Sequence, residues 1–168
     1  SSINMNRKLM IAVIVLIISA ASFARSFLGL VGVIPWHYGY SDIFNEDRIS
    51  PELAKNIPYL EAQIEYPVVT GFFIYAMRHF GKNLLGYALL SWIFLAICAV
   101  ITSLTLYKLT EILNIDDKRL FWFFIFAPSL IVFSVYNWDI IAIMFMVLAI
   151  YFFCQNRHMQ SAVFLSLG

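Results

Sequence analysis

Residues 84–107 have the sequence LLGYALLSWIFLAICAVITSLTLY, a run of 24 residues without a charged side chain. At the rise of an α-helix such a run is about 36 Å long, and the hydrocarbon core of a bilayer is about 30 Å thick. A helix pairs its own backbone N–H and C=O groups, which lipid cannot do for it. The run therefore predicts a transmembrane helix.

A second run of this kind lies near the N-terminus. Residues 9–30, LMIAVIVLIISAASFARSFLGL, are apolar except for Arg25, and Arg7 and Lys8 precede them. Because positive charge beside a span favours the cytoplasmic side, we expect a first span whose N-terminal end is cytoplasmic. A cleaved signal peptide is the alternative, but its apolar region is usually about 7 to 15 residues long and ends in small residues.

The composition of the chain also indicates a membrane protein. The 168 residues have a mean hydropathy of +0.83, and 12% of them are charged, against about 25% in an average soluble domain. The formal net charge of +1 gives no basis for binding nucleic acid, and no nucleic-acid partner is predicted. Cys98 and Cys154 lie inside apolar runs without the spacing of a metal or redox motif, so they are predicted to be packing residues.

Further apolar runs predict an all-α, polytopic transmembrane helical bundle. The third and fourth spans are expected at about 120–136 and 140–153, and residues 161–168 begin a fifth. Because this last run stops without a polar flank, the chain, 1–168, is interpreted as the N-terminal part of one transmembrane domain.

The segment 68–80 decides the predicted topology. It is apolar but only 13 residues long, which favours an interfacial helix over a full crossing. With this helix on the outer surface, four later basic residues fall on the cytoplasmic side, as the positive-inside rule favours: Lys108, Lys118, Arg119 and Arg157. The loop 36–66 and the turn 137–139 then share the extracytoplasmic side. If 68–80 spans instead, the loop and the turn lie on opposite sides.

The loop 36–66 is acidic and aromatic. A short helix is expected at about 51–55, because Ser50 is a good N-cap and Pro51 suits the first helical position. Connections longer than about 12 to 15 residues are usually functional or disordered, and the aromatic content here favours an ordered, functional loop. Its carboxylates are Asp42, Glu46, Asp47, Glu52, Glu61 and Glu65, and its Trp and Tyr residues are Trp36, Tyr38, Tyr40, Tyr59 and Tyr66.

Four short motifs carry a resemblance to a known family. They are Tyr40-Ser41-Asp42, Pro58-Tyr59-Leu60, the run from Glu65-Tyr66-Pro67 to Gly71, and Asn137-Trp138-Asp139. In their order and their placement relative to the spans they resemble the GT-C superfamily of membrane glycosyltransferases, most closely the family 87 polyprenyl-phosphate-mannose-dependent mannosyltransferases. The resemblance covers about residues 25–139 and implies a surface helix after the tyrosine–proline motif. Val68 departs from it, since a second proline is common there.

The resemblance implies an enzyme that moves a hexose, expected to be mannose, from a polyprenyl-phosphate donor to a lipid-linked or cell-envelope glycan. Asp42 matches the acid of the family's first loop, which implies a general base for the acceptor hydroxyl. Arg25 lies near the outer end of the first span, where a guanidinium can bind a phosphate. No metal ligand is predicted, because the carboxylates lack a recognised ligand spacing, although a divalent metal remains an option. The candidate substrate-binding residues are Glu65, Tyr66, Asp139, Arg25, Tyr40 and Trp138.

Each candidate also has a purely structural interpretation. Asp42 and Asp139 are each placed to cap a turn or a helix, and Glu65 to lie solvated where a helix begins. Arg25 can reach lipid headgroups, and Trp138 can belong to an interfacial aromatic belt. Two other classes of function stay open, a non-catalytic membrane scaffold or lipid-binding protein and a transporter. A transporter usually places ionisable residues inside its spans, where this chain has little besides Arg25.

Overall fold

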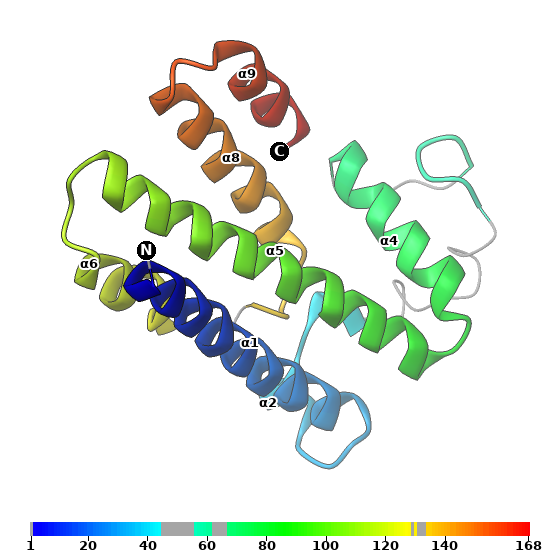
Figure 1. Ribbon diagram of the computed structural model, residues 1–168. Coiled ribbons are helices and arrows are strands. Elements are labelled where there is room, and N and C mark those ends of the chain that lie inside the picture. The colour runs from blue at the N-terminus through cyan, green and yellow to red at the C-terminus, as the bar shows by residue number, and fades with distance from the viewer. Residues whose placement is uncertain (1, 45–55, 62–66, 129, 131–133) are drawn as a thin grey trace.

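The computed structural model describes residues 2–44, 56–61, 67–128, 130 and 134–168. Over these residues the chain is mostly helical and contains no β-strand, which confirms the all-α class (Figure 1). Two helices are long and apolar enough to cross a membrane, residues 6–30 of α1 (Ser2–Leu30) and the whole of α5 (Leu84–Ile112). Both cover the spans predicted for them.

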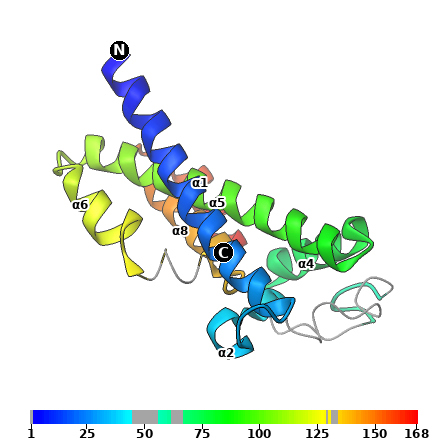
Figure 2. The ribbon, with the colours of Figure 1, turned by 90° about the horizontal axis from the view of Figure 1, so that it is seen from below.

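Helices α1 and α5 cross each other in opposite directions (Figures 1 and 2). Phe23 of α1 stacks on Trp92 of α5, with ring centroids 5.3 Å apart. The buried side of each helix is rich in small and hydroxyl side chains, namely Ser19, Ser22 and Ser26 of α1 and Ala88, Ser91, Ala99, Thr102 and Ser103 of α5.

The outward sides of the same two helices carry large apolar side chains. They include Leu9, Val13, Leu16 and Ile17 of α1 and a stripe at every fourth position of α5, Leu85, Leu89, Ile93, Ile97 and Ile101. Small residues inside and large apolar residues outside are typical of helices that pack against each other in lipid. The two helices thus place their small side chains at the contact and their large apolar side chains on the outside.

Helix α4 (Val68–Gly81) covers the segment predicted to be an interfacial helix. Its 14 residues make it about 21 Å long, and it packs against α5. The turn between them is tight: Lys82 has a φ of 53°, and the side chain of Asn83 caps α5 by accepting from the N–H of Gly86 at 2.7 Å.

The segment predicted as the third span, 120–136, differs from one continuous helix. A short turn, α6 (Lys118–Leu120), leads into a π-helix, η3 (Phe121–Ile125), which ends at Phe126. Pro128 explains this ending, because proline disfavours helical backbone at the residue before it and has no N–H to donate. Pro128 and Leu130 are themselves helical again.

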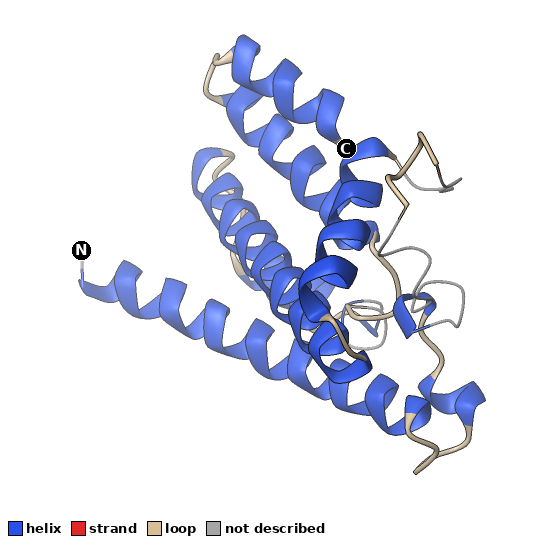
Figure 3. Ribbon diagram, turned by 90° about the vertical axis from the view of Figure 1, so that its right-hand side faces the viewer, coloured by secondary structure: helices blue, strands red, loops and turns tan. Residues whose placement is uncertain are grey.

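The last two helices form an antiparallel pair, best seen in Figure 3. They are α8 (Asp139–Cys154), at the position of the fourth predicted span, and α9 (His158–Leu167), which includes the start of the fifth. The hydroxyl of Ser161 donates to the carbonyl of Ala149 at 2.8 Å and ties the pair together. The helix expected at 51–55 lies outside the described residues.

Candidate functional site

Two loops that are far apart in the sequence are joined by hydrogen bonds. After α1 the chain forms a short helix, α2 (Trp36–Gly39), and a single 3-10 turn, η1 (Asp42–Phe44). The hydroxyl of Ser41 donates to the carbonyls of Val135 and Tyr136 at 2.8 and 3.0 Å. The N–H of Asp42 also donates to the carbonyl of Tyr136, at 2.8 Å. The loop that carries Asp42 is thus attached to the segment just before Asn137-Trp138-Asp139.

The carboxylate of Asp42 is held by a tyrosine two residues earlier. The hydroxyl of Tyr40 donates to Oδ1 of Asp42 at 2.6 Å, and both side chains are half-buried. The ring of Tyr40 lies 5.5 Å from that of Trp36 and 5.5 Å from that of Tyr136. Trp36 is exposed, so the aromatic cluster beside Asp42 keeps an open side. Tyr40, a predicted site residue, is therefore next to the predicted general base.

Arg25 binds the loop rather than standing apart from it. Its Nη1 donates to the carbonyl of Tyr38 at 3.2 Å and its Nη2 to the hydroxyl of Ser26 at 3.3 Å. A glycine pair makes this approach possible, since a Cβ on Gly39 would lie 2.6 Å from Cα of Gly29 and 2.9 Å from the carbonyl oxygen of Arg25. Glycine is thus required at the contact, and Arg25 holds α2 against the end of α1.

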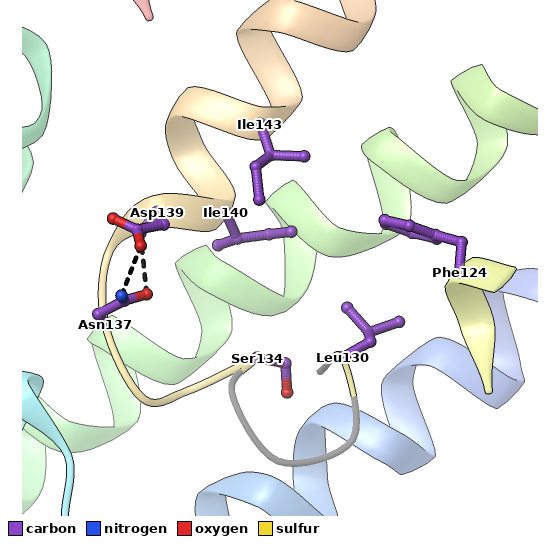
Figure 4. A pocket seen from close by; sticks show the side chains of 7 residues that line it. All are labelled: Phe124, Leu130, Ser134, Asn137, Asp139, Ile140 and Ile143. Atoms are coloured by element: carbon purple, nitrogen blue, oxygen red, sulfur yellow. Dashed lines mark hydrogen bonds between the residues drawn. The ribbon is translucent and has the colours of Figure 1, made fainter. Parts of the chain in front are cut away.

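The turn before α8 borders a hollow in the surface. Asn137 and Asp139 face each other across the turn: Nδ2 of Asn137 donates to Oδ2 of Asp139 at 2.6 Å, and the N–H of Asp139 donates to Oδ1 of Asn137 at 3.2 Å (Figure 4). The hollow has a volume of about 270 Å³ and an otherwise largely apolar lining, Phe124, Leu130, Ser134, Ile140 and Ile143. Asp139 is exposed at the first position of α8, where a negative charge is favourable.

Among the predicted site residues that the structure describes, Trp138 is the one whose side chain is fully buried. Its side chain is 1% exposed and is the largest of the fully buried side chains. Its ring packs inside the chain, so it has no open face to offer a substrate. The open rings at this end of α1 belong to Trp36 and Tyr38.

Sequence reasoning missed three residues that support the site. Ser41 and Tyr136 make the hydrogen bonds described above, and the buried hydroxyl of Tyr87 in α5 donates to the carbonyl of Ile43 at 2.9 Å. Arg78 of α4 is 9% exposed, with its guanidinium 6.0 Å from the ring centre of Tyr87. Of these residues only Ser41 lies inside one of the four motifs, so the sequence indicates a role in the site for Ser41 alone.

The second part of the predicted loop is described only in pieces. Glu65 and Tyr66 lie outside the described residues. Tyr59, at a φ of 65°, places its ring over Gly71 in the first turn of α4 and donates to the carbonyl of Pro67 at 2.8 Å. Desolvation raises the pKa of Tyr59 above its ordinary value of 10.0, against a smaller lowering effect of the backbone of Gly71.

The described carboxylates do not form a metal site by themselves. No group of three or more His, Cys, Asp or Glu side chains among the described residues is arranged to hold a metal ion. Asp42 and Asp139 each have a neighbouring side chain as hydrogen-bond donor, from Tyr40 and Asn137 respectively. What this arrangement offers is two carboxylates and open aromatic rings at one end of the helices.

Comparison with known proteins identifies no relative of this chain. No family model matches the sequence, and neither a curated protein nor a solved structure matches the chain.

Proposed function

We propose that the protein is a multi-pass membrane glycosyltransferase that moves a hexose, mannose in the first instance, from a polyprenyl-phosphate donor to a lipid-linked or cell-envelope glycan. In this proposal the N-terminus is cytoplasmic and the reaction takes place at the extracytoplasmic surface. The observation that carries the proposal is the attachment of the Asp42 loop to the segment before Asp139. Hydrogen bonds attach the Tyr40-Ser41-Asp42 motif to Val135 and Tyr136, the two residues that directly precede the Asn137-Trp138-Asp139 motif nearly a hundred residues later.

Asp42 has the chemistry and the surroundings that a general base needs. One carboxylate oxygen of Asp42 accepts a hydrogen bond from Tyr40. This bond fixes the orientation of the carboxylate and therefore also the position of its second oxygen. In the proposed step Asp42 removes the proton of an acceptor hydroxyl as that oxygen bonds to the anomeric carbon of the donor sugar. The bond between the anomeric carbon and the phosphate oxygen breaks, and the polyprenyl phosphate leaves with the electron pair.

The neighbouring groups have matching roles in recognition. Asn137 and Asp139 present amide and carboxylate groups that hydrogen-bond to sugar hydroxyls. The exposed rings of Trp36 and Tyr38 offer apolar faces on which a sugar ring stacks. Arg25 lies within this end of the fold and supplies positive charge near the place where the phosphate leaves. Glu65 and Tyr66 remain predicted substrate-binding residues.

The test is Asp42→Asn in membranes from cells that produce the whole protein, assayed with a labelled polyprenyl-phosphate mannose. Loss of a positioned general base is expected to slow transfer about 100-fold or more. Glu61→Gln is the matched control, because Glu61 is an exposed carboxylate of the same loop whose described contact is local, to the N–H of Ile57 at 2.9 Å. Transfer that is equally fast in Asp42→Asn and the parent protein would refute the assignment of Asp42, and no transfer by the parent with any hexose donor would refute the function.

A further inference from the structure

The opposite end of the fold carries a hollow that the proposed reaction does not use. It lies among the start of α1 and the ends of α5 and α8, and its volume is about 390 Å³. Its lining is polar for a site between apolar helices: Lys8, Lys108, Glu111, Tyr151 and Gln155, together with Ile112. These residues come from three different helices, so the fold and not one local motif assembles the group.

Positive charge dominates this hollow. Lys8 and Lys108 face a single lining carboxylate, Glu111, which also interacts with the hydroxyl of Tyr107. The ammonium of Lys108 lies 5.5 Å from the ring centre of Tyr151 and is thereby placed over one wall. Asp117, another acid described at this end, is paired with Arg7. The hollow therefore suits an anion that also accepts hydrogen bonds.

The surroundings indicate what kind of anion this is. The hollow adjoins the ends of the two helices that are long enough to cross a membrane, at the level where headgroups begin. Beside it, large apolar side chains point outward from all three helices, among them Leu9, Ile112 and Phe153. A bound molecule thus has a hollow lined by lysine and other polar side chains next to an apolar surface that acyl chains can follow. Basic pockets between membrane helices at this depth suit lipid phosphates.

We infer that this hollow binds the headgroup of an anionic phospholipid. Lys8 and Lys108 contact the phosphate from two helices, and Tyr151 and Gln155 donate hydrogen bonds to its oxygens or to the headgroup hydroxyls. The acyl chains lie along the outward faces of α1 and α8. The inference is independent of the glycosyltransferase proposal, since the two sites lie at opposite ends of α1.

The test uses the whole chain in a non-ionic detergent and native mass spectrometry with added phosphatidylglycerol or phosphatidylcholine. The unmodified chain is expected to bind phosphatidylglycerol more tightly than phosphatidylcholine. The double variant Lys8→Gln/Lys108→Gln is expected to bind phosphatidylglycerol roughly 25-fold more weakly, at about fivefold for each lysine. The matched control, Lys118→Gln/Arg119→Gln, removes two exposed charges at the same end outside the hollow and is expected to keep the affinity.

Glu111→Gln supplies a test that does not depend on the folding of the double variant. Removing the carboxylate from the lining is expected to tighten binding of phosphatidylglycerol a few-fold. The inference is overturned if the two double variants lose affinity equally, because the attraction is then a diffuse effect of net charge. It is also overturned if the unmodified chain does not distinguish the two lipids, or if Glu111→Gln leaves the affinity for phosphatidylglycerol unchanged or weaker. Displacement of the lipid by millimolar inorganic phosphate would overturn it too, because the site would then be one for free phosphate.

Discussion

Ser41→Ala tests the contact on which the candidate site depends. The hydroxyl of Ser41 is fully buried, donates to the carbonyls of Val135 and Tyr136, and accepts from the N–H of Ile43 at 3.3 Å. After the substitution the carbonyl of Tyr136 keeps the N–H of Asp42 as a partner, whereas the carbonyl of Val135 loses a buried donor. A buried polar group left without its partner costs about 1–3 kcal/mol. We therefore expect the free energy of unfolding to fall by about 1.5 kcal/mol, within that range.

The assay is equilibrium unfolding in mixed dodecyl sulfate and non-ionic detergent micelles, followed by tryptophan fluorescence. Ser166→Ala is the matched control, because Ser166 is exposed and its hydroxyl donates only within its own helix, to the carbonyl of Val163 at 2.8 Å. The control is expected to change the free energy of unfolding by less than about 0.5 kcal/mol. If Ser41→Ala is no more destabilising than Ser166→Ala, the two loops are not held together as described, and the shared site loses its structural basis.

Three further predictions concern the site and its topology. Tyr40→Phe removes the hydrogen bond that orients Asp42, and it is expected to slow transfer from the labelled donor about tenfold with little change in KM. An unchanged rate would show that Tyr40 does not position the base. Because partial desolvation raises the pKa of Tyr59 in the folded chain, the unfolded chain loses this proton more readily above pH 10, so stability should fall as the pH rises through and above that value. Tyr59→Phe should flatten this part of the stability curve, and identical curves for the two proteins would contradict the desolvation of the phenol. Single cysteines are placed at Glu61 or at Lys118 in a chain without its native cysteines, and intact cells are treated with a membrane-impermeant thiol reagent. The cysteine at 61 is expected to be labelled and the one at 118 is not; labelling at 118 would mean that the segment 68–80 spans the membrane.

The two long helices were predictable because apolar run length is a strong signal. The runs at 9–30 and 84–107 became α1 and α5, and the shorter run at 68–80 became α4. The run at 120–136 has the same apolar character but contains Pro128, and the backbone limits of proline prevail over hydropathy there. Composition cannot report such a break, because a broken and an unbroken helix use the same residues.

The candidate site was predictable only as a set of sequence positions. Asp42, Tyr40 and Asp139 were identified from short motifs, but the contact between their loops depends on backbone carbonyls that any residue would supply. The burial of Trp138 also has no sequence signal, since a tryptophan beside a polar turn suits an interfacial belt as well as a core. Partners of this kind become visible only when the chain is folded.

The hydrogen bond between Ser41 and Val135 also limits how early during synthesis the candidate site can form. The two residues are 94 positions apart, and at a synthesis rate of about 5 to 20 residues per second the acceptor emerges roughly 5 to 20 s after the donor. During that interval the Asp42 loop can already accept from the hydroxyl of Tyr87 at Ile43, but the carbonyls of Val135 and Tyr136 are not yet present. A chain that stalls before residue 135 would therefore contain α1 and the Asp42 loop but lack the two carbonyls that hold this loop in the candidate site.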